Sequence, residues 1–224
     1  MAKILVVAAH PDDEVLGCGG SIAHHVDAGD EVRVIILAEG LTSRGVCTQD
    51  DLLGLAASAQ AASKILGVSE LYLHKFPDNR MDSVDRLDIT RVVENHIKEF
   101  EPNIVYTHYE GDLNYDHRIV SESVNIACRP QTDSSVHTLL YFEIPSSTDW
   151  QPVGSRTAFT PNWFIDINGH IDKKIKALKE YESEMRPTPH SRSLESITHL
   201  AKWRGAMVSL YAAEAFVLGR RRIN

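Results

Sequence analysis

The chain has 224 residues, which is enough for one large domain or, less comfortably, two small ones. Its hydrophobic fraction of 43% suffices for a core, and its charged fraction of 24% is ordinary for a globular protein. The formal net charge of -8 argues against nucleic acid as a partner, because phosphate binding needs a basic face.

The sequence also argues against secretion and against a membrane span. No apolar run approaches the roughly 20 residues needed to cross a bilayer, and the opening MAKILVVAAHPDDE makes a poor signal peptide. Cys18, Cys47 and Cys128 are scattered and odd in number. They predict small buried thiols in a reducing compartment rather than a disulfide framework. We therefore expect a cytoplasmic protein.

Apolar runs alternate with amphipathic segments through residues 1–143. The runs predict strands at 3–8, 32–38, 71–73, 103–107 and 138–142. The segments between them predict helices at 14–28, 50–66, 84–100 and 116–128, and the second has Thr48 as N-cap and Gly67 as its stop. This order predicts an α/β fold with a mostly parallel central sheet and right-handed crossovers. Strands of such a sheet are buried on both faces, which explains their unbroken apolar character.

The alternation loosens beyond residue 143. Residues 145–162 are rich in Pro, Ser and Thr and predict a long loop. A strand at 163–167 and helices at 171–184 and 193–209 are expected to follow, and the basic cluster at 220–222 is expected to be a solvated tail. No linker is evident, so we predict one domain over 1–224. In it, 1–143 form the core and 144–224 complete the sheet and add covering helices.

Two polar motifs leave the carboxyl ends of predicted strands. HPDDE follows the first strand, and THYEGDLNYDHR follows the fourth. In an open parallel sheet ligands bind beyond these ends, and the usual doubly wound order makes the first and fourth strands neighbours. We therefore expect His10, Asp12, Asp13 and His117 to converge although they are far apart in the sequence.

These residue types suit a metal centre. A catalytic zinc takes three protein ligands and keeps one position open for water. His10, Asp13 and His117 would supply the ligands, and the cation would offset the repulsion between neighbouring acids. Asp12 is then free to act as a base on the metal-bound water. Taken one at a time, the acids are also explained as helix N-terminal residues favoured by the helix dipole.

Gly17, Gly19 and Gly20 follow a strand and invite comparison with a dinucleotide-binding loop. The spacing does not fit, because Ile22 stands where that motif needs a glycine. Close packing of the helix on the sheet is the better explanation for these glycines.

The A-H-P-D-D-E and D-L-N-x-D-H-R motifs resemble those of the zinc-dependent N-deacetylases of the PIG-L and LmbE-like family. The resemblance implies a Rossmann-like three-layer fold, a zinc ion (Zn2+) and hydrolysis of an acetamide on an amino sugar. It further implies that His10, Asp13 and His117 bind the metal and that Asp12 is the general base. The same ligands also suit other divalent transition metals.

The resemblance leaves the electrophilic partner open, because Asn114 stands where some members carry a histidine. Asn114 is one candidate for that role, and His108 at the end of the fourth strand is the other. Asp116 is expected to orient an imidazole ligand by hydrogen bonding. Glu14 either opens the helix or orients His10.

The function predicted from these residues is metal-dependent removal of an N-acetyl group from an N-acetylated amino sugar or glycoconjugate, with release of acetate. Relatives of this kind often form homo-oligomers. The alternatives are an amidase or phosphoesterase with the same metal site, and a sugar- or nucleotide-binding module without catalysis. Candidate substrate-binding residues in loops beyond the strand ends are Arg44, Asp78, Arg80, His190 and Arg192.

Overall fold

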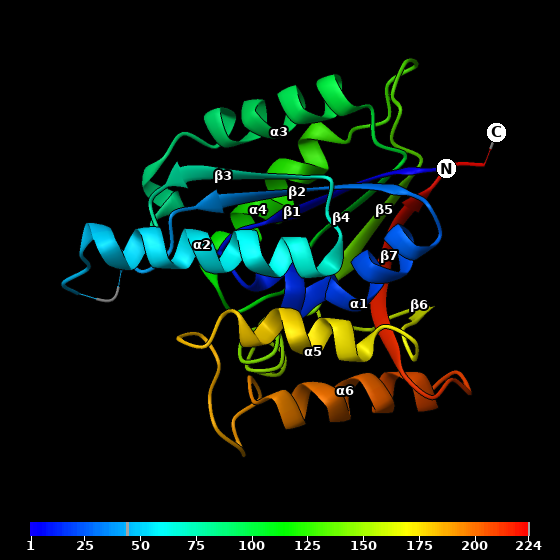
Figure 1. Ribbon diagram of the computed structural model, residues 1–224. Coiled ribbons are helices and arrows are strands. Elements are labelled where there is room, and N and C mark those ends of the chain that lie inside the picture. The colour runs from blue at the N-terminus through cyan, green and yellow to red at the C-terminus, as the bar shows by residue number, and fades with distance from the viewer. Residues whose placement is uncertain (44, 224) are drawn as a thin grey trace.

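A seven-stranded sheet forms the centre of the computed structural model, which describes residues 1–43 and 45–223. Its strands lie in the order β3-β2-β1-β4-β5-β7-β6 (Figure 1). The first five pair in parallel, whereas β7 runs antiparallel to both of its neighbours. The strands are β1 (Lys3–Ala8), β2 (Glu31–Ala38), β3 (Glu70–Phe76), β4 (Ile104–His108), β5 (Thr138–Phe142), β6 (Trp163–Asp166) and β7 (Ala213–Arg221). The predicted α/β fold with a mostly parallel sheet is confirmed.

Helices cover both faces of the sheet and complete three layers (Figure 1). Helices α3 and α4 pack on one face and α1 and α2 on the other, while α5 packs against α1 and α2, and α6 lies beside α5 and β7. None of the helices in residues 1–43 and 45–223 is long and apolar enough to cross a membrane. The helices are α1 (Asp13–Asp27), α2 (Gln49–Leu66), α3 (Arg86–Phe100), α4 (Tyr115–Ala127), α5 (Ile171–Lys179), α6 (Leu194–Ala206) and the short 3-10 helix η1 (Met81–Ser83).

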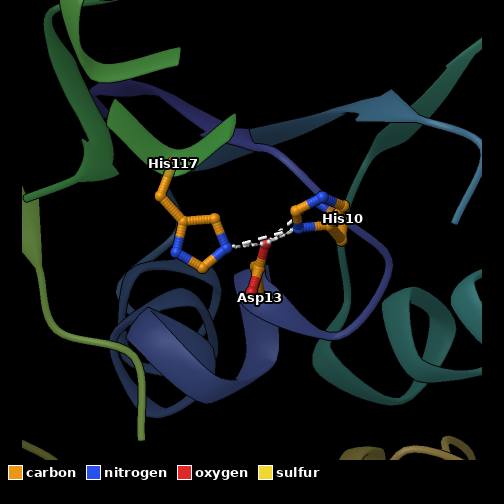
Figure 2. A group of neighbouring side chains, drawn as sticks. All are labelled: His10, Asp13 and His117. Carbon is orange, nitrogen blue, oxygen red and sulfur yellow. Dashed lines mark hydrogen bonds and ion pairs between the residues drawn. The ribbon is translucent and has the colours of Figure 1, made fainter. Parts of the chain in front are cut away.

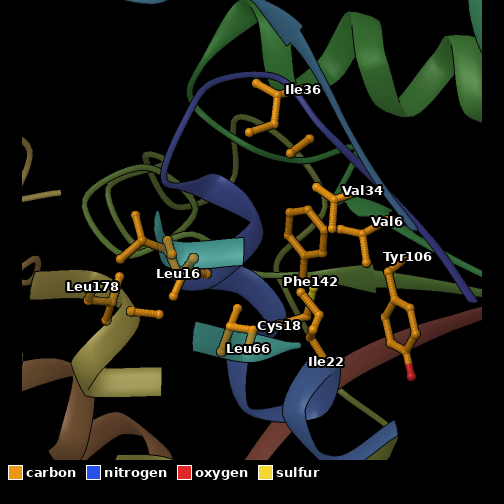
Figure 3. Close-up of a cluster of buried hydrophobic side chains, with 14 of the residues drawn as sticks. Val6, Leu16, Cys18, Ile22, Val34, Ile36, Leu66, Tyr106, Phe142 and Leu178 are labelled. Carbon is orange, nitrogen blue, oxygen red and sulfur yellow. The ribbon is translucent and has the colours of Figure 1, made fainter. Parts of the chain in front are cut away.

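The side chains of β1 alternate between two hydrophobic clusters. Ile4 and Val6 belong to the cluster beneath α1 and α2, which Figure 3 shows in part. Leu5 and Val7 belong to the cluster beneath α3 and α4. Successive side chains of a strand point to opposite faces, so a strand covered on both sides must be apolar throughout. Full burial of each large side chain contributes roughly 1.5–3 kcal/mol.

The glycines of α1 allow the helix to approach the sheet closely. A Cβ atom on Gly17 would lie 2.5 Å from the ring of Phe142 in β5. A Cβ atom on Gly20 would lie 2.8 Å from the side chain of Ile167. Both distances are below van der Waals contact, so close packing accounts for these glycines as the sequence indicated.

The C-terminal region differs from the sequence prediction. Residues 220–222 are not a solvated tail, because Arg220 and Arg221 belong to β7, which lies inside the sheet between β5 and β6. The guanidinium of Arg222 donates to the Ser134 carbonyl at 2.7 Å. Helices α5 and α6 end at Lys179 and Ala206, before the predicted ends. Among the cysteines, Cys18 and Cys128 are buried as expected, but Cys47 is half-exposed.

Candidate active site and metal centre

The sheet order brings the two polar motifs together. Strands β1 and β4 are parallel neighbours, so the turn after β1 and the start of α4 meet at one edge of the sheet. There His10 Nδ1 lies 3.2 Å from Asp13 Oδ2 and 3.3 Å from His117 Nε2, and the latter two atoms are 3.2 Å apart. Figure 2 shows the three side chains converging from the turn, from α1 and from α4. The structure thus brings together the three predicted ligands.

The tight turn between β1 and α1 is held by its own acids. Asp12 precedes α1 in a left-handed conformation, with φ of 109°, which is uncommon for a residue with a side chain. The Asp13 carboxylate accepts a hydrogen bond from the His10 backbone amide at 2.8 Å. Glu14 accepts from the Asp12 amide at 3.1 Å and from the Tyr181 hydroxyl at 2.6 Å. Of the two roles considered for Glu14, this placement fits the opening of the helix.

His10 is oriented from its far side by carboxylates. Its Nε2 lies 3.1 Å from Asp116 Oδ2 and 3.4 Å from Asp78 Oδ1. Backbone amides of Asn79 and Met81 donate to Asp116 at 2.7 and 3.0 Å, so that carboxylate is itself fixed. A proton on Nε2 that points to these acids leaves the Nδ1 lone pair free to bind a metal. Asp116 therefore has the placement expected from the sequence.

Charges at the site alter the pKa values of both imidazoles. Burial lowers the pKa of His10, but hydrogen bonds to Asp116 and Asp13 outweigh it and raise the value to about 10. Burial also lowers the pKa of His117, but the carboxylates of Asp13 and Asp112 outweigh it and raise the value to about 9. Burial raises the pKa of Asp13, and the histidines around it bring the value well below normal. The site thus concentrates negative charge where a cation would bind.

Asp112 is a site residue that the sequence analysis did not single out. Its Oδ1 lies 3.1 Å from Nδ1 of His117, and its side chain is fully buried. The hydroxyl groups of Ser147 and Thr148 donate to its carboxylate, Thr148 at 2.6 Å. Burial raises the pKa of Asp112, but His117 and these hydroxyls lower it to about 2. The signal was present, because Asp112 is the first residue of D-L-N-x-D-H-R.

His108 lies behind the ligands. It is fully buried, and its ring stacks on that of His117 with the centroids 4.0 Å apart. Its Nε2 accepts a hydrogen bond from the Ala9 backbone amide at 2.8 Å. Burial brings the pKa of His108 well below its usual value, which favours the neutral ring. This placement suits support of His117 and does not favour contact with a substrate.

Asn114 is the N-cap of α4. Its side-chain carbonyl accepts from the backbone amides of Asp116 and His117 at 2.8 and 3.4 Å. Its Nδ2 donates one hydrogen to Asn79 Oδ1 at 2.9 Å. Asn114 also lines the cleft beside His10.

Asp12 lies in the wall of this cleft, which has about 380 Å³ of empty space, part of it open to solvent. Only 2% of Asp12 is exposed, and its Oδ2 accepts from Arg192 Nη1 at 2.9 Å. Burial raises the pKa of Asp12 well above normal, and neighbouring carboxylates add to this effect while Arg192 opposes it. The cleft is lined by His10, Pro11, Asp12, Gly40, Leu41, Leu55, Asp78, Asn79, Asn114, Glu184 and Arg192.

The remaining substrate-binding candidates are scattered. Asp78 and Arg192 line the cleft, although both already bind protein groups. His190 accepts from the Arg192 amide at 3.0 Å and packs edge-on against Trp150, so it shapes its loop. Arg80 is exposed at the start of η1 and is absent from the lining of this cleft. Arg44 lies outside the described residues.

The model of a known protein family matches the part of the chain that contains this site. The sequence model of PIG-L, described as GlcNAc-PI de-N-acetylase, matches residues 5–128, which is more than half of the chain. The chain belongs to the PIG-L family. The matched region runs from β1 to the end of α4 and contains both polar motifs and the three predicted ligands.

Named relatives of this PIG-L chain are deacetylases. It is 28% identical to the diacetylchitobiose deacetylase of Thermococcus kodakarensis over 81% of this chain and 70% of that protein. It is 30% identical to the 1D-myo-inositol 2-acetamido-2-deoxy-alpha-D-glucopyranoside deacetylase of Mycobacterium sp. (strain JLS) over 89% and 79% of the two chains.

The fold alone does not decide the reaction. The crystal structure of the 4-carboxy-2-hydroxymuconate hydratase of Pseudomonas putida KT2440 matches with a TM-score of 0.77. The match covers 100% of this chain and 98% of the hydratase at 22% identity. One fold can carry different chemistries, so the reaction has to be argued from the site.

Proposed function

We propose that this PIG-L protein is a zinc-dependent hydrolase that removes the N-acetyl group from an N-acetylated amino sugar or glycoconjugate. The observation that carries the proposal is the triangle of His10, Asp13 and His117 donors beside the buried carboxylate of Asp12. The acetylated sugars in the names of the two deacetylase relatives support the substrate class.

The donor set fits a zinc ion. Zinc bonds of about 2.0–2.1 Å at tetrahedral angles place donor atoms about 3.3 Å apart. The three donor separations here are 3.2, 3.3 and 3.2 Å. Within the described residues, the second oxygen of the Asp13 carboxylate, Oδ1, is buried without a hydrogen-bond partner, so the carboxylate has an oxygen that no protein group satisfies. When bound, zinc acts as a Lewis acid and lowers the pKa of a coordinated water to about 7.

Asp12 would carry the proton during the reaction. It takes a proton from the water that adds to the acetyl carbon, and it then delivers this proton to the nitrogen as the C–N bond breaks. Acetate and a free amine result. Burial and the neighbouring carboxylates raise the pKa of Asp12, which makes it a stronger base than an exposed aspartate.

Asn114 is the stronger of the two candidates for the electrophilic partner. An amide nitrogen has two hydrogens, and only one of those on Asn114 is directed to Asn79. The second hydrogen is available to a developing oxyanion in the cleft. His108 lacks this access because its ring is fully buried behind His117.

The decisive test is Asp12→Asn, which keeps the shape of the side chain and removes the base. Acetate release from N-acetylglucosamine and diacetylchitobiose should fall about 10²–10⁴-fold, while zinc measured by elemental analysis stays stoichiometric. His10→Ala should lose the zinc as well as the activity. The exposed Asp133→Asn is the matched control. An unchanged rate in Asp12→Asn contradicts the role of the base, and phosphate release from phosphate esters without acetate release would indicate the phosphoesterase alternative.

A further inference from the structure

Arg192 joins three segments of the chain above the acidic turn. Its Nη1 donates to Asp12 Oδ2 at 2.9 Å, and its Nε donates to Ser146 Oγ at 2.7 Å. The same Nη1 lies 3.7 Å from Glu184 Oε2. The side chains of Asp12 and Glu184 are each 3% exposed and that of Arg192 is 19% exposed, so these charges meet largely out of water.

We propose that Arg192 is a positioning residue for Asp12: its guanidinium fixes the carboxylate in the wall of the cleft, and Ser146 and Glu184 fix the guanidinium. The inference rests on the proposed function, since it assigns a purpose to the orientation of the general base. It differs from the substrate-binding role that the sequence suggested for Arg192.

The three consecutive acids each have a different partner. Asp13 contacts His10 and His117, and Glu14 accepts from Tyr181. The partner of Asp12 is Arg192. A buried carboxylate without a partner would be costly, and repulsion from the two adjacent acids would turn it away. Arg192 therefore supplies the contact that this side chain requires.

The backbone of Arg192 is itself held in place. The ring of His190 accepts from the Arg192 amide at 3.0 Å. The next residue, Ser193, is the N-cap of α6 and accepts from the Ser196 amide at 3.0 Å. These two hydrogen bonds fix the loop on either side of Arg192, so its guanidinium reaches Asp12 from a defined position. Such rigidity is what a positioning residue needs, because small displacements of a reacting group lower rates strongly.

The kinetic test compares substitutions at Arg192 in the zinc-loaded full chain. Arg192→Gln should lower kcat by about 100-fold, with KM changed less than about threefold and zinc content unchanged. Arg192→Lys should recover part of the loss, and added guanidinium should raise kcat of Arg192→Ala. The matched control is Arg186→Gln in the same loop, whose guanidinium donates to the backbone carbonyls of Ser183 and Met185. A rise in KM at unchanged kcat would overturn the inference in favour of substrate binding.

A second readout does not depend on activity. The variants Asp12→Asn, Arg192→Gln and the double variant form a cycle in which the zinc-loaded chain is unfolded with urea. The double variant should be more stable than the sum of the single effects allows, by at least about fivefold in the unfolding constant. If the effects of the two single substitutions on stability simply add in the double variant, the proposed role of the contact between Arg192 and Asp12 is contradicted. If the wild-type chain releases no acetate from any acetylated sugar, the proposed function fails, whereas the cycle still reports separately on the pair.

Discussion

The region matched by the PIG-L model and the region that follows it make different contributions to one site. Residues 5–128 contain the proposed metal ligands His10, Asp13 and His117 together with Asp12. Residues 144–221 contribute groups that hold these side chains or their partners in place. Tyr181 binds Glu14, Arg192 binds Asp12, and Thr148 binds Asp112. The geometry of a site whose main groups lie in residues 5–128 thus depends on residues of the second region.

A buried ion pair within the second region also contacts the first region. The Nζ atom of Lys174 in α5 lies 2.6 Å from Oε1 of Glu214 in β7, and both side chains are 5% exposed. Glu214 accepts from the Gly20 and Ser21 amides at 2.9 and 2.6 Å, just after α1 departs from helical geometry at Cys18. The helix that starts at the metal centre is therefore anchored by the last strand.

The strongest test of this dependence is Glu214→Gln. It should lower the free energy of unfolding by about 3 kcal/mol, because it leaves the Lys174 charge buried without its partner. Urea unfolding measures the change. Lys173→Met is the matched control, because Lys173 pairs with Asp27 at the surface and its loss should alter stability little. Equal effects of the two substitutions would contradict the anchoring role.

A smaller effect is expected where the second region supports a ligand through an intermediate residue. Asp112→Asn keeps the size of the side chain but removes the charge that faces His117 Nδ1. Zinc affinity, measured by competition with a chelator, should fall about 10–100-fold. Asp133→Asn, at the surface, serves as control. Unchanged zinc affinity would show that the hydroxyls of the second region do not act on the metal centre through Asp112.

The smallest effects compare close packing with open space on the same side of the sheet. Gly17→Ala should lower the free energy of unfolding by about 1–3 kcal/mol, because the added methyl group would overlap Phe142. Gly54→Ala in α2 meets no atom within 4 Å and should raise it by about 0.5–1 kcal/mol. Thermal and urea unfolding of both variants check the opposite signs. Stability changes of the same sign in both variants would mean that α1 can move away from Phe142 to accommodate the added methyl group.

Much of the parallel half could be predicted from local pattern. Strands β1, β2, β4 and β5 are mainly apolar, and helix α2 has the Thr48 cap and the Gly67 stop that the sequence indicated. The adjacency of β1 and β4 followed from the doubly wound order, and it placed His117 beside His10. These features follow from the preferences of residues close together in the sequence and from the usual strand order of doubly wound sheets.

The antiparallel half could not be predicted in the same way. Strand β7 has a basic end, and only its pairing with β5 and β6 makes it a strand. The sequence suggested a substrate-binding role for Arg192 and did not reveal its contact with Asp12, because the two residues lie far apart in the sequence. Helix α5 ends early, and Tyr181 beyond it turns inward to Glu14. In each of these cases the structure depends on contacts between residues far apart in the sequence, which a local sequence pattern does not reveal.

The two histidines present different ring nitrogens to the metal site, Nδ1 from His10 and Nε2 from His117. Nδ1 is as many bonds from the backbone as an asparagine or aspartate side-chain oxygen. Nε2 is as many bonds away as the corresponding oxygen of glutamine or glutamate. A redesign of the centre toward an all-oxygen ligand set would therefore use a short acid at position 10 and a long one at position 117, and exchanging the two would move both donors away from the ion.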